Sequence, residues 1–340
     1  MLVFQADYLA EVGKRIFVAV GAPEDVAAHV AASLVESNLV GHDSHGVIRI
    51  PTYIARTREG MYVATGRPET LRETSTTGVV SGNWGFGQIA ATYATDLAIR
   101  KARAHDLGAV GVVQCNHIGR LGEYAYRGAQ QGFITIVSAG GFPGGAQAPF
   151  GGAGRALGTN PFAFGVPGSS SQPMVVDFAT TIVAEGKLQV ARAKREPVPP
   201  GWVMDKEGNP STNVEDFYAG GTLLPFGGHK GYGLAMVAEV LSSTLSGLSE
   251  TRGKRAGHGT FVMALNPAAF RTYTDFATEN DALFAKVRGM APAKGFNEVM
   301  VPGDPEMRAR AKRLVDGIPV AEDTWAKIQS TADELGAVLP

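Results

Sequence analysis

Apolar residues near the start of the chain recur at the spacing that places them on one face of a helix. Two segments show this period: Leu9, Val12 and Ile16 in the first, and Val26, Val30 and Leu34 in the second. Asp7 can cap the first helix, Pro23 fits the opening position of the second, and Gly41 fits the stop after it. The pattern therefore predicts two N-terminal helices.

From residue 78 onward, short apolar runs alternate with helical periods. Short runs bounded by turn residues are typical of buried strands. The predicted strands are 78–82, 109–114, 133–138, 162–166, 174–178 and 259–265. Predicted helices cover 183–190, 229–246 and, as a pair, 303–336, whereas the polar stretch 65–78 is predicted to be a connector. An α/β fold of packed layers follows.

Composition and charge narrow the classes of protein. The 340 residues carry a formal charge of -1, which does not favour nucleic acid or an anionic membrane as a partner. The charges of "EMRARAKR" (306–313) are interpreted as a solvated helix face. No apolar run is long enough to span a bilayer, and the first residues do not resemble a signal peptide. The single cysteine, Cys115, suits a reducing compartment, so we expect a cytoplasmic protein.

The stretch "GHDSHGVIRI" (41–50) gathers ionisable side chains beside an apolar helix. If Asp43 caps a short helix, His45 and Arg49 share one face. A histidine can exchange a proton near neutrality, and the arginine fork suits a carboxylate. Ser44 could orient the imidazole or a substrate oxygen. The group fits a substrate with a carboxylate beside a carbonyl or hydroxyl carbon, which is a 2-oxo or 2-hydroxy acid.

Two other interpretations of this stretch stay open. His42, Asp43 and His45 could be metal ligands, although histidines on a helical metal site usually lie four apart and nothing nearby completes a set. The segment could also be a polar helix boundary whose groups only satisfy backbone donors.

A dinucleotide fingerprint is present but misplaced. "GFGQIA" (85–90) matches G-x-G-x-x-[GA], yet the acidic residue that should follow the second strand, Asp106, precedes the run 109–114. We interpret the glycines as a tight turn at a helix start. Any nucleotide is expected to bind without Rossmann geometry.

The stretch 41–53, "GHDSHGVIRIPTY", resembles the signature of the type 2 malate/L-lactate dehydrogenase family. Further blocks resemble that family in the same order: "NHIGRLGEYA" (116–125), "LGTNPFAFGVP" (157–167), "VVDFATT" (175–181), "GHKGYGLAMVAEVLSSTLSG" (228–247) and "GFNEVMVPGDPE" (295–306). The family also contains diketogulonate, ureidoglycolate, sulfolactate and cyclic-imine oxidoreductases. The resemblance covers nearly the whole chain.

The resemblance implies a non-Rossmann, NAD- or NADP-dependent oxidoreductase that works as a homodimer on a small 2-oxo or 2-hydroxy acid. It implies a mixed-sheet cofactor domain and a helical domain built from both chain termini. The expected regions are 1–75, helical with the signature; 76–302, binding cofactor and substrate; and 303–340, helices that pack back on the first region.

By position, the resemblance also assigns roles to residues. His45 is the expected acid/base with Ser44 as its companion, and His117 is the other candidate for proton transfer. Arg49 and Thr159 are expected to bind substrate. The expected cofactor contacts are His117, Ile118, Gly119, Arg120, Leu121, Ser138, Asp177, Phe178, Ala179, Lys230 and Glu298. For Asp177 the plainer alternative is a cap on the helix after its strand, and for Lys230 a solvated position at a helix start.

Lys187, in "AEGKLQ", occupies the position at which cyclic-imine reductases of this family carry an acidic residue. This difference disfavours an imine substrate and favours a carbonyl/alcohol couple. Lys187 could lie near the anionic substrate, or it could only belong to a helix start. A cyclic-imine reductase and a non-catalytic metal- or metabolite-binding module are the two alternatives to a hydroxyacid dehydrogenase.

Overall fold

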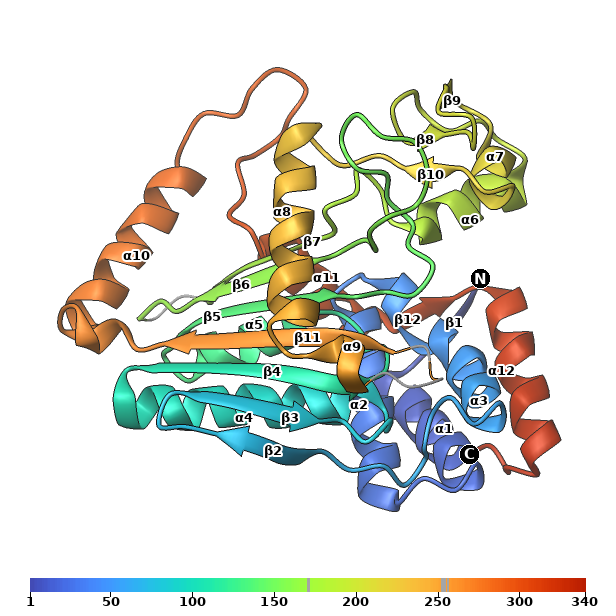
Figure 1. Ribbon diagram of the computed structural model, residues 1–340, viewed down its shortest axis with the longest axis horizontal. Helices are drawn as coiled ribbons and strands as arrows, with labels where there is room; N and C mark the ends of the chain where they lie inside the picture. The colour runs from blue at the N-terminus through green and yellow to red at the C-terminus, as the bar shows by residue number, and fades with distance from the viewer. Residues whose placement is uncertain (170–171, 252–254, 256) are drawn as a thin grey trace.

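The computed structural model describes residues 1–169, 172–251, 255 and 257–340. The two chain ends meet in one helical layer, in which strands β1 and β12 pair antiparallel (Figure 1). Its core holds fully buried side chains such as Phe17, Leu34, Tyr53 and Ile328. Its elements are β1 (Leu2–Phe4), α1 (Ala6–Ala19), α2 (Glu24–Leu39), α3 (Ile50–Arg58), β12 (Ile318–Val320) and α12 (Glu322–Leu335).

A seven-stranded sheet fills the centre, in the order β2-β3-β4-β11-β5-β6-β7. Only β3 and β4 run parallel; the other neighbours are antiparallel. The strands are β2 (Glu69–Glu73), β3 (Thr77–Ser81), β4 (Leu107–Cys115), β5 (Ile134–Gly140), β6 (Phe162–Val166), β7 (Met174–Phe178) and β11 (His258–Leu265).

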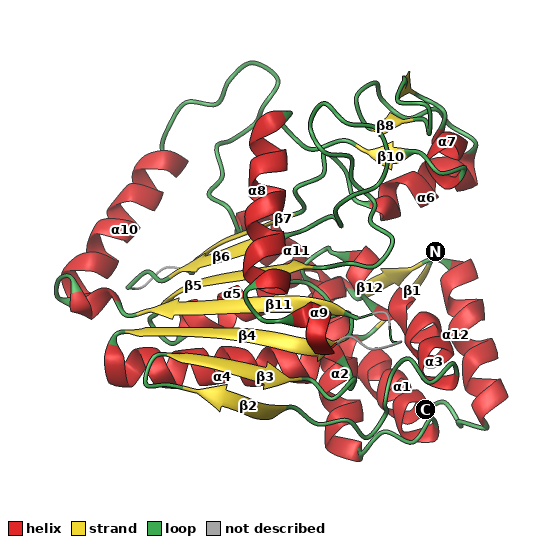
Figure 2. Cartoon of the chain, viewed as in Figure 1, coloured by secondary structure: helices red, strands yellow, loops and turns green. Residues whose placement is uncertain are grey.

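Helices cover both faces of this sheet (Figure 2). Helices α4 (Gly87–His105) and α5 (Gly122–Gln130) lie behind it in this view. Helix α8 (His229–Glu239), the π-helical turn η3 (Val240–Thr244) and the short α9 (Leu248–Thr251) lie in front. The sheet is mixed and most of its pairs are antiparallel, so the expected non-Rossmann α/β architecture is confirmed.

A smaller unit is built between β7 and α8. It contains α6 (Glu185–Lys194), β8 (Val203–Met204), β9 (Pro210–Ser211), α7 (Val214–Tyr218) and β10 (Thr222–Leu223). Its strands form a separate sheet in the order β10-β8-β9, and Leu188, Val203 and Leu223 are fully buried in its apolar cluster. The remaining helices are α10 (Tyr273–Arg288) and α11 (Asp304–Asp316).

Several local expectations were wrong. Asp7 does not cap α1, because the helix begins at Ala6 and no side chain caps it. Pro23 lies just outside α2, which begins at Glu24. The predicted connector 65–78 contains β2, an edge strand whose side chains are mostly exposed and therefore lack an apolar pattern.

Within the described ranges, no helix combines the length and apolarity that crossing a bilayer requires.

Candidate active site

Residues 41–53, which we call the signature segment, do not form one helix from Asp43. They form two 3-10 turns, η1 (Asp43–His45) and η2 (Val47–Arg49), followed by α3. Between the turns, Gly46 has an extended backbone. The Asn38 side chain fills the space against it: Asn38 Oδ1 accepts from Val47 N at 2.8 Å, and its Nδ2 donates to Asp43 at 2.6 Å. A Cβ on Gly46 would lie 2.1 Å from Asn38 Oδ1, so the turn requires glycine.

Helix α11, from the C-terminal part of the chain, holds the signature segment. Arg313 donates to both carboxylate oxygens of Asp43, at 2.6 and 3.0 Å. His42 lies 3.3 Å from Glu306. The interpretation of 306–313 as a solvated helix face is therefore correct only in part. Arg308 and Lys312 are exposed, whereas the other charged side chains pair with the N-terminal part: Glu306, Arg310 and Arg313. Among the residues that the structure describes, no three His, Cys, Asp or Glu side chains gather to hold a metal ion.

A cavity of about 280 Å³ opens above the signature segment, and we call it the His45 cavity. Eight of the predicted site residues line it: Ser44, His45, Arg49, His117, Ile118, Gly119, Leu121 and Thr159. They come from the signature segment, the loop after β4 and the loop before β6. The structure thus brings together the residues predicted for proton transfer and carboxylate binding.

Within this cavity, Ser44 Oγ lies 3.0 Å from Nδ1 of His45. Burial, reinforced by the positive charge of Arg49, lowers the pKa of His45 to about 3. The imidazole is therefore neutral at physiological pH, which is the form that can accept a proton. Arg49 uses Nε to donate to the Ser44 carbonyl at 2.6 Å, and its other guanidinium nitrogens make no hydrogen bond to a described residue. They are available to a carboxylate in the cavity.

His117 lies beside His45, with nearly parallel rings. Its Nδ1 lies 2.7 Å from the Tyr53 hydroxyl. Burial lowers the pKa of His117 well below its usual value, and the charge of Arg49 acts in the same direction. The two stacked imidazoles, His45 and His117, are thus held neutral in the free protein.

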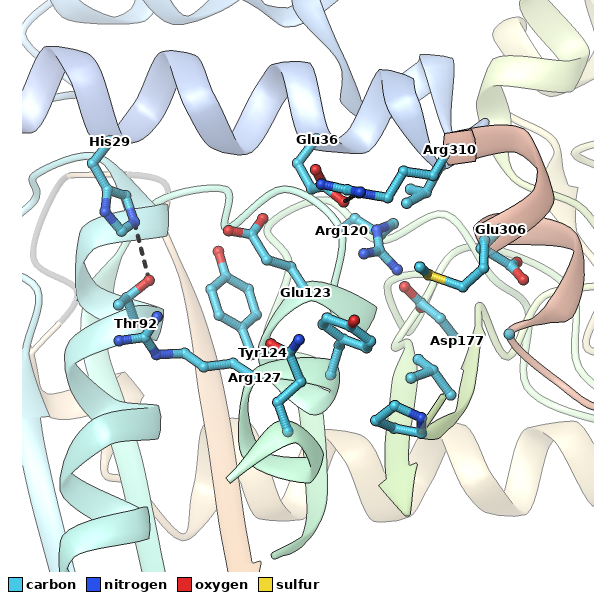
Figure 3. Close-up of a pocket in the computed structure, with 17 residues that line it drawn as sticks. His29, Glu36, Thr92, Arg120, Glu123, Tyr124, Arg127, Asp177, Glu306 and Arg310 are labelled. Carbon is cyan, nitrogen blue, oxygen red and sulfur yellow. Dashed lines mark hydrogen bonds and ion pairs between the residues drawn. The ribbon is translucent and has the colours of Figure 1, made fainter. Parts of the chain in front are cut away.

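A second cavity, of about 410 Å³, lies between α2, α4, α5 and α11 (Figure 3); we call it the Arg120 cavity. Arg120 is only 6% exposed, yet its side chain makes no hydrogen bond or ion pair with any described residue, and its Nε is buried without a partner. The Asp177 carboxylate faces the Arg120 side chain and accepts a hydrogen bond from Gly122 N at 2.7 Å. A buried guanidinium without an acceptor is costly unless a ligand or solvent completes it, so this cavity suits an anion.

Burial raises the pKa values of two carboxyl groups in the Arg120 cavity, those of Asp177 and Glu123. The positive charge of Arg120 partly offsets this rise at both groups. Asp177 does not cap the helix after its strand; it binds the first residue of α5, Gly122. A Cβ on Gly122 would lie 2.3 Å from Arg120 Nη1 and 2.9 Å from Asp177 Oδ2, so glycine lets these two side chains approach.

The other predicted residues lie outside both cavities. Ser138 is buried and its Oγ lies 2.9 Å from that of Ser242. Phe178 packs against Phe164 and Phe226. The remaining four residues also lie away from the two cavities, each on a different element. They are Ala179 just after β7, Lys187 exposed on α6, Lys230 exposed at the start of α8, and Glu298 paired with Arg308.

Sequence reasoning missed several residues of the site. Tyr53 belongs to the quoted signature, but no role was derived for it. Gln88, Glu185 and His258 were given no role, although Gln88 lies in "GFGQIA" and Glu185 in "AEGKLQ". Gln88 contacts Tyr53 from α4, and Glu185 and His258 line the His45 cavity. Only the three-dimensional arrangement brings these residues together, because they lie far from the signature in the sequence.

Comparison with known proteins agrees with this geometry. The family model for malate/L-lactate dehydrogenase matches residues 4–329. Hydroxycarboxylate dehydrogenase B of Escherichia coli (strain K12) is 34% identical over 349 residues, covering 98% of this chain and 94% of the relative. The crystal structure of malate dehydrogenase from Entamoeba histolytica superposes with a TM-score of 0.94 at 29% identity, covering 100% of this chain and 99% of that one. Delta1-piperideine-2-carboxylate reductase from Pseudomonas syringae is also similar, with a TM-score of 0.85 at 28% identity, covering 98% and 100% of the two chains.

The fold and these matches define an oxidoreductase of the hydroxyacid dehydrogenase class, which acts with a nicotinamide cofactor on small hydroxy or oxo acids. The chain belongs to the malate/L-lactate dehydrogenase family.

Proposed function

We propose that this protein catalyses reversible hydride transfer between NAD or NADP and the C2 carbon of a small 2-oxo or 2-hydroxy carboxylic acid. The observation that carries the proposal is the His45 cavity, where a neutral imidazole and an available guanidinium line the same space. Relatives named as hydroxycarboxylate and malate dehydrogenases support this class of substrate.

Arg49 would hold the substrate carboxylate through its free nitrogens, and Thr159, which lines the same cavity, would also contact the substrate. In the direction of oxidation, neutral His45 takes the proton of the C2 hydroxyl. In the direction of reduction, His45 must first be protonated. A carboxylate bound to Arg49 cancels the charge that helps to lower the His45 pKa, so substrate binding itself favours that protonation. Ser44 orients the imidazole through its contact with Nδ1.

When bound, the nicotinamide cofactor supplies or accepts the hydride. The segment 117–121 separates the two cavities: Ile118, Gly119 and Leu121 line the His45 cavity and Arg120 lines the other. We assign the anionic part of the cofactor to Arg120, whose guanidinium lacks an acceptor, and a ribose hydroxyl to Asp177. Ser138, Phe178, Ala179, Lys230 and Glu298 are proposed as further contacts by the resemblance alone.

We further propose that the enzyme works in the cytoplasm as a homodimer, with 1–75, 76–302 and 303–340 as its functional regions. The buried, free thiol of Cys115 suits a reducing compartment. Burial raises its pKa to about 12, so it is not a nucleophile.

The second candidate is a cyclic-imine reductase. Glu185 places a carboxylate at the His45 cavity, where it could attract a cationic imine, and the similar piperideine-carboxylate reductase has this activity by name. Lys187, by contrast, stands where such a reductase carries an acidic residue, so the chain lacks the carboxyl group expected at this position. Its side chain is also exposed and does not line the cavity.

One assay separates the candidates. The purified protein is given NADH or NADPH with pyruvate, oxaloacetate and other 2-oxo acids, and in parallel with piperideine-2-carboxylate. We expect oxidation of the reduced cofactor with at least one 2-oxo acid and far less with the imine. Turnover of the imine alone would select the second candidate.

A further inference from the structure

Hydrogen bonds at His117 have a direction that can be read from the chemistry of the donors. The Gln88 amide nitrogen, 3.1 Å from the Tyr53 oxygen, can only donate. The proton of the Tyr53 hydroxyl is then free to point at His117 Nδ1, 2.7 Å away. The backbone N–H of Gly119 also donates to Nδ1, at 3.3 Å. The Gly119 N–H therefore requires Nδ1 of His117 to be an acceptor, and the Tyr53 hydroxyl, whose proton is not used at Gln88, then donates to the same nitrogen.

An imidazole whose Nδ1 accepts carries its proton on Nε2 when neutral. His117 lines the His45 cavity, and no described residue bonds to its Nε2. Nε2–H is thus the ring group left for a ligand. The second nitrogen of His45 remains open in the same cavity, since Ser44 occupies only Nδ1.

The close stacking of the two rings makes their charges interdependent. A proton on one imidazole disfavours a proton on the other, because like charges at this distance repel. Donors at Nδ1 favour the neutral form of His117, so the proton of the pair is directed to His45.

We propose that Tyr53, oriented by Gln88, is a positioning residue that fixes His117 as a neutral Nε2–H imidazole. In this state His117 donates a hydrogen bond to the C2 oxygen of the substrate and transfers no proton, while His45 alone takes or gives the proton. The assignment to the C2 oxygen rests on the proposed function; the fixed tautomer does not.

The charged groups around His117 are compatible with this state. Arg49 and His45 face it from the signature segment, and His258 faces it from β11, and each disfavours a positive charge on its ring. Tyr62 is a second tyrosine next to His117. Its hydroxyl oxygen accepts a hydrogen bond from the backbone N–H of His117 at 3.3 Å and makes no hydrogen bond to the imidazole. Tyr62 therefore offers a matched control for Tyr53.

The tautomer can be measured directly, without turnover. Protein labelled with 15N-histidine is studied by two-bond 1H–15N correlation spectra, and the His117 signals are assigned by their loss in His117→Gln. We expect the Nε2–H pattern at neutral pH and no titration of His117 between roughly pH 5 and 8. An Nδ1–H pattern in the unmodified protein would overturn the proposal, because Tyr53 would then be the acceptor.

Tyr53→Phe keeps the ring and removes only the hydroxyl. We expect the His117 pKa to rise by about one unit in this variant, because a donor that favours the neutral form is lost, and to stay unchanged in Tyr62→Phe. For an accepted 2-oxo acid, kcat should fall about tenfold, less than the loss on removing a hydrogen-bond donor outright, with little change in KM. An unchanged His117 pKa in Tyr53→Phe would contradict the role of Tyr53. Absence of turnover by the unmodified protein would instead count against the proposed function.

Discussion

The imidazole rings of His45 and His117 lie almost parallel, at 11° to each other, with their centroids 5.5 Å apart. Each ring has one nitrogen held by a hydroxyl, from Ser44 at His45 and from Tyr53 at His117. Two imidazoles so close cannot both be charged without mutual repulsion. The arrangement favours one ring for proton transfer and the other for hydrogen bonding.

The first prediction concerns His45. His45→Ala should lower turnover of the best 2-oxo acid by a factor on the order of 10²–10⁴, the usual contribution of a positioned acid/base. Cofactor affinity, followed by fluorescence titration of the reduced nicotinamide, should change little. His105→Ala, at the exposed end of α4, is the control and should behave like the unmodified protein. Full activity in the His45 variant with loss in a His117 variant would transfer the proton role to His117.

The second prediction concerns the carboxylate anchor. Arg49→Lys keeps the charge but loses the planar fork, so KM for the oxo acid should rise about tenfold or more while kcat changes less. The exposed Arg56, which pairs with Glu59 on α3, provides the control Arg56→Lys. Equal kinetics for the two variants would show that Arg49 does not hold the substrate.

The pH dependence follows from the lowered pKa of His45. In the free protein this group is neutral above a pKa of about 3, so kcat/KM for oxidation of a hydroxy acid should show no loss from His45 protonation between about pH 5 and 8. Reduction needs the protonated form, which becomes scarcer as pH rises, so kcat/KM for the oxo acid should fall by about tenfold per pH unit over that range. A pH-independent reduction would exclude His45 as the proton donor.

The contact between α11 and the signature segment can be tested by removing Arg313. Arg313→Met breaks the bonds to Asp43 and to the Asn38 carbonyl. We expect the free energy of unfolding to fall by about 1 kcal/mol, because the Asp43 side of the pair is half exposed. We also expect kcat/KM to fall, because η1 carries Ser44 and His45.

Lys312→Met is the matched control for that experiment. Lys312 is the adjacent residue, its side chain is exposed, and its partner Asp316 belongs to the same helix. Normal activity in the Arg313 variant would show that the signature segment keeps its shape without α11.

The sequence predicted the buried strands because their apolar runs are continuous; β6 begins and ends at the predicted residues 162 and 166. The strand β2, "ETLRE", was missed because it lies at the sheet edge and exposes most of its side chains. The pairing of His45 with Arg49 in one cavity was predicted, but from the wrong geometry, since two 3-10 turns replace the expected helix. Tyr53, Gln88 and α11 enter the site through tertiary contacts that no local spacing encodes.

The central claim is that the His45 cavity binds an oxo acid and moves its proton during transfer of a nicotinamide hydride. The most direct measurement follows the oxidation of NADH or NADPH by a panel of 2-oxo acids, with the unmodified protein and His45→Ala side by side. The account predicts substrate-dependent oxidation that His45→Ala lowers by a factor on the order of 10² or more. Absence of oxidation with every 2-oxo acid, or equal rates in the two proteins, would contradict it.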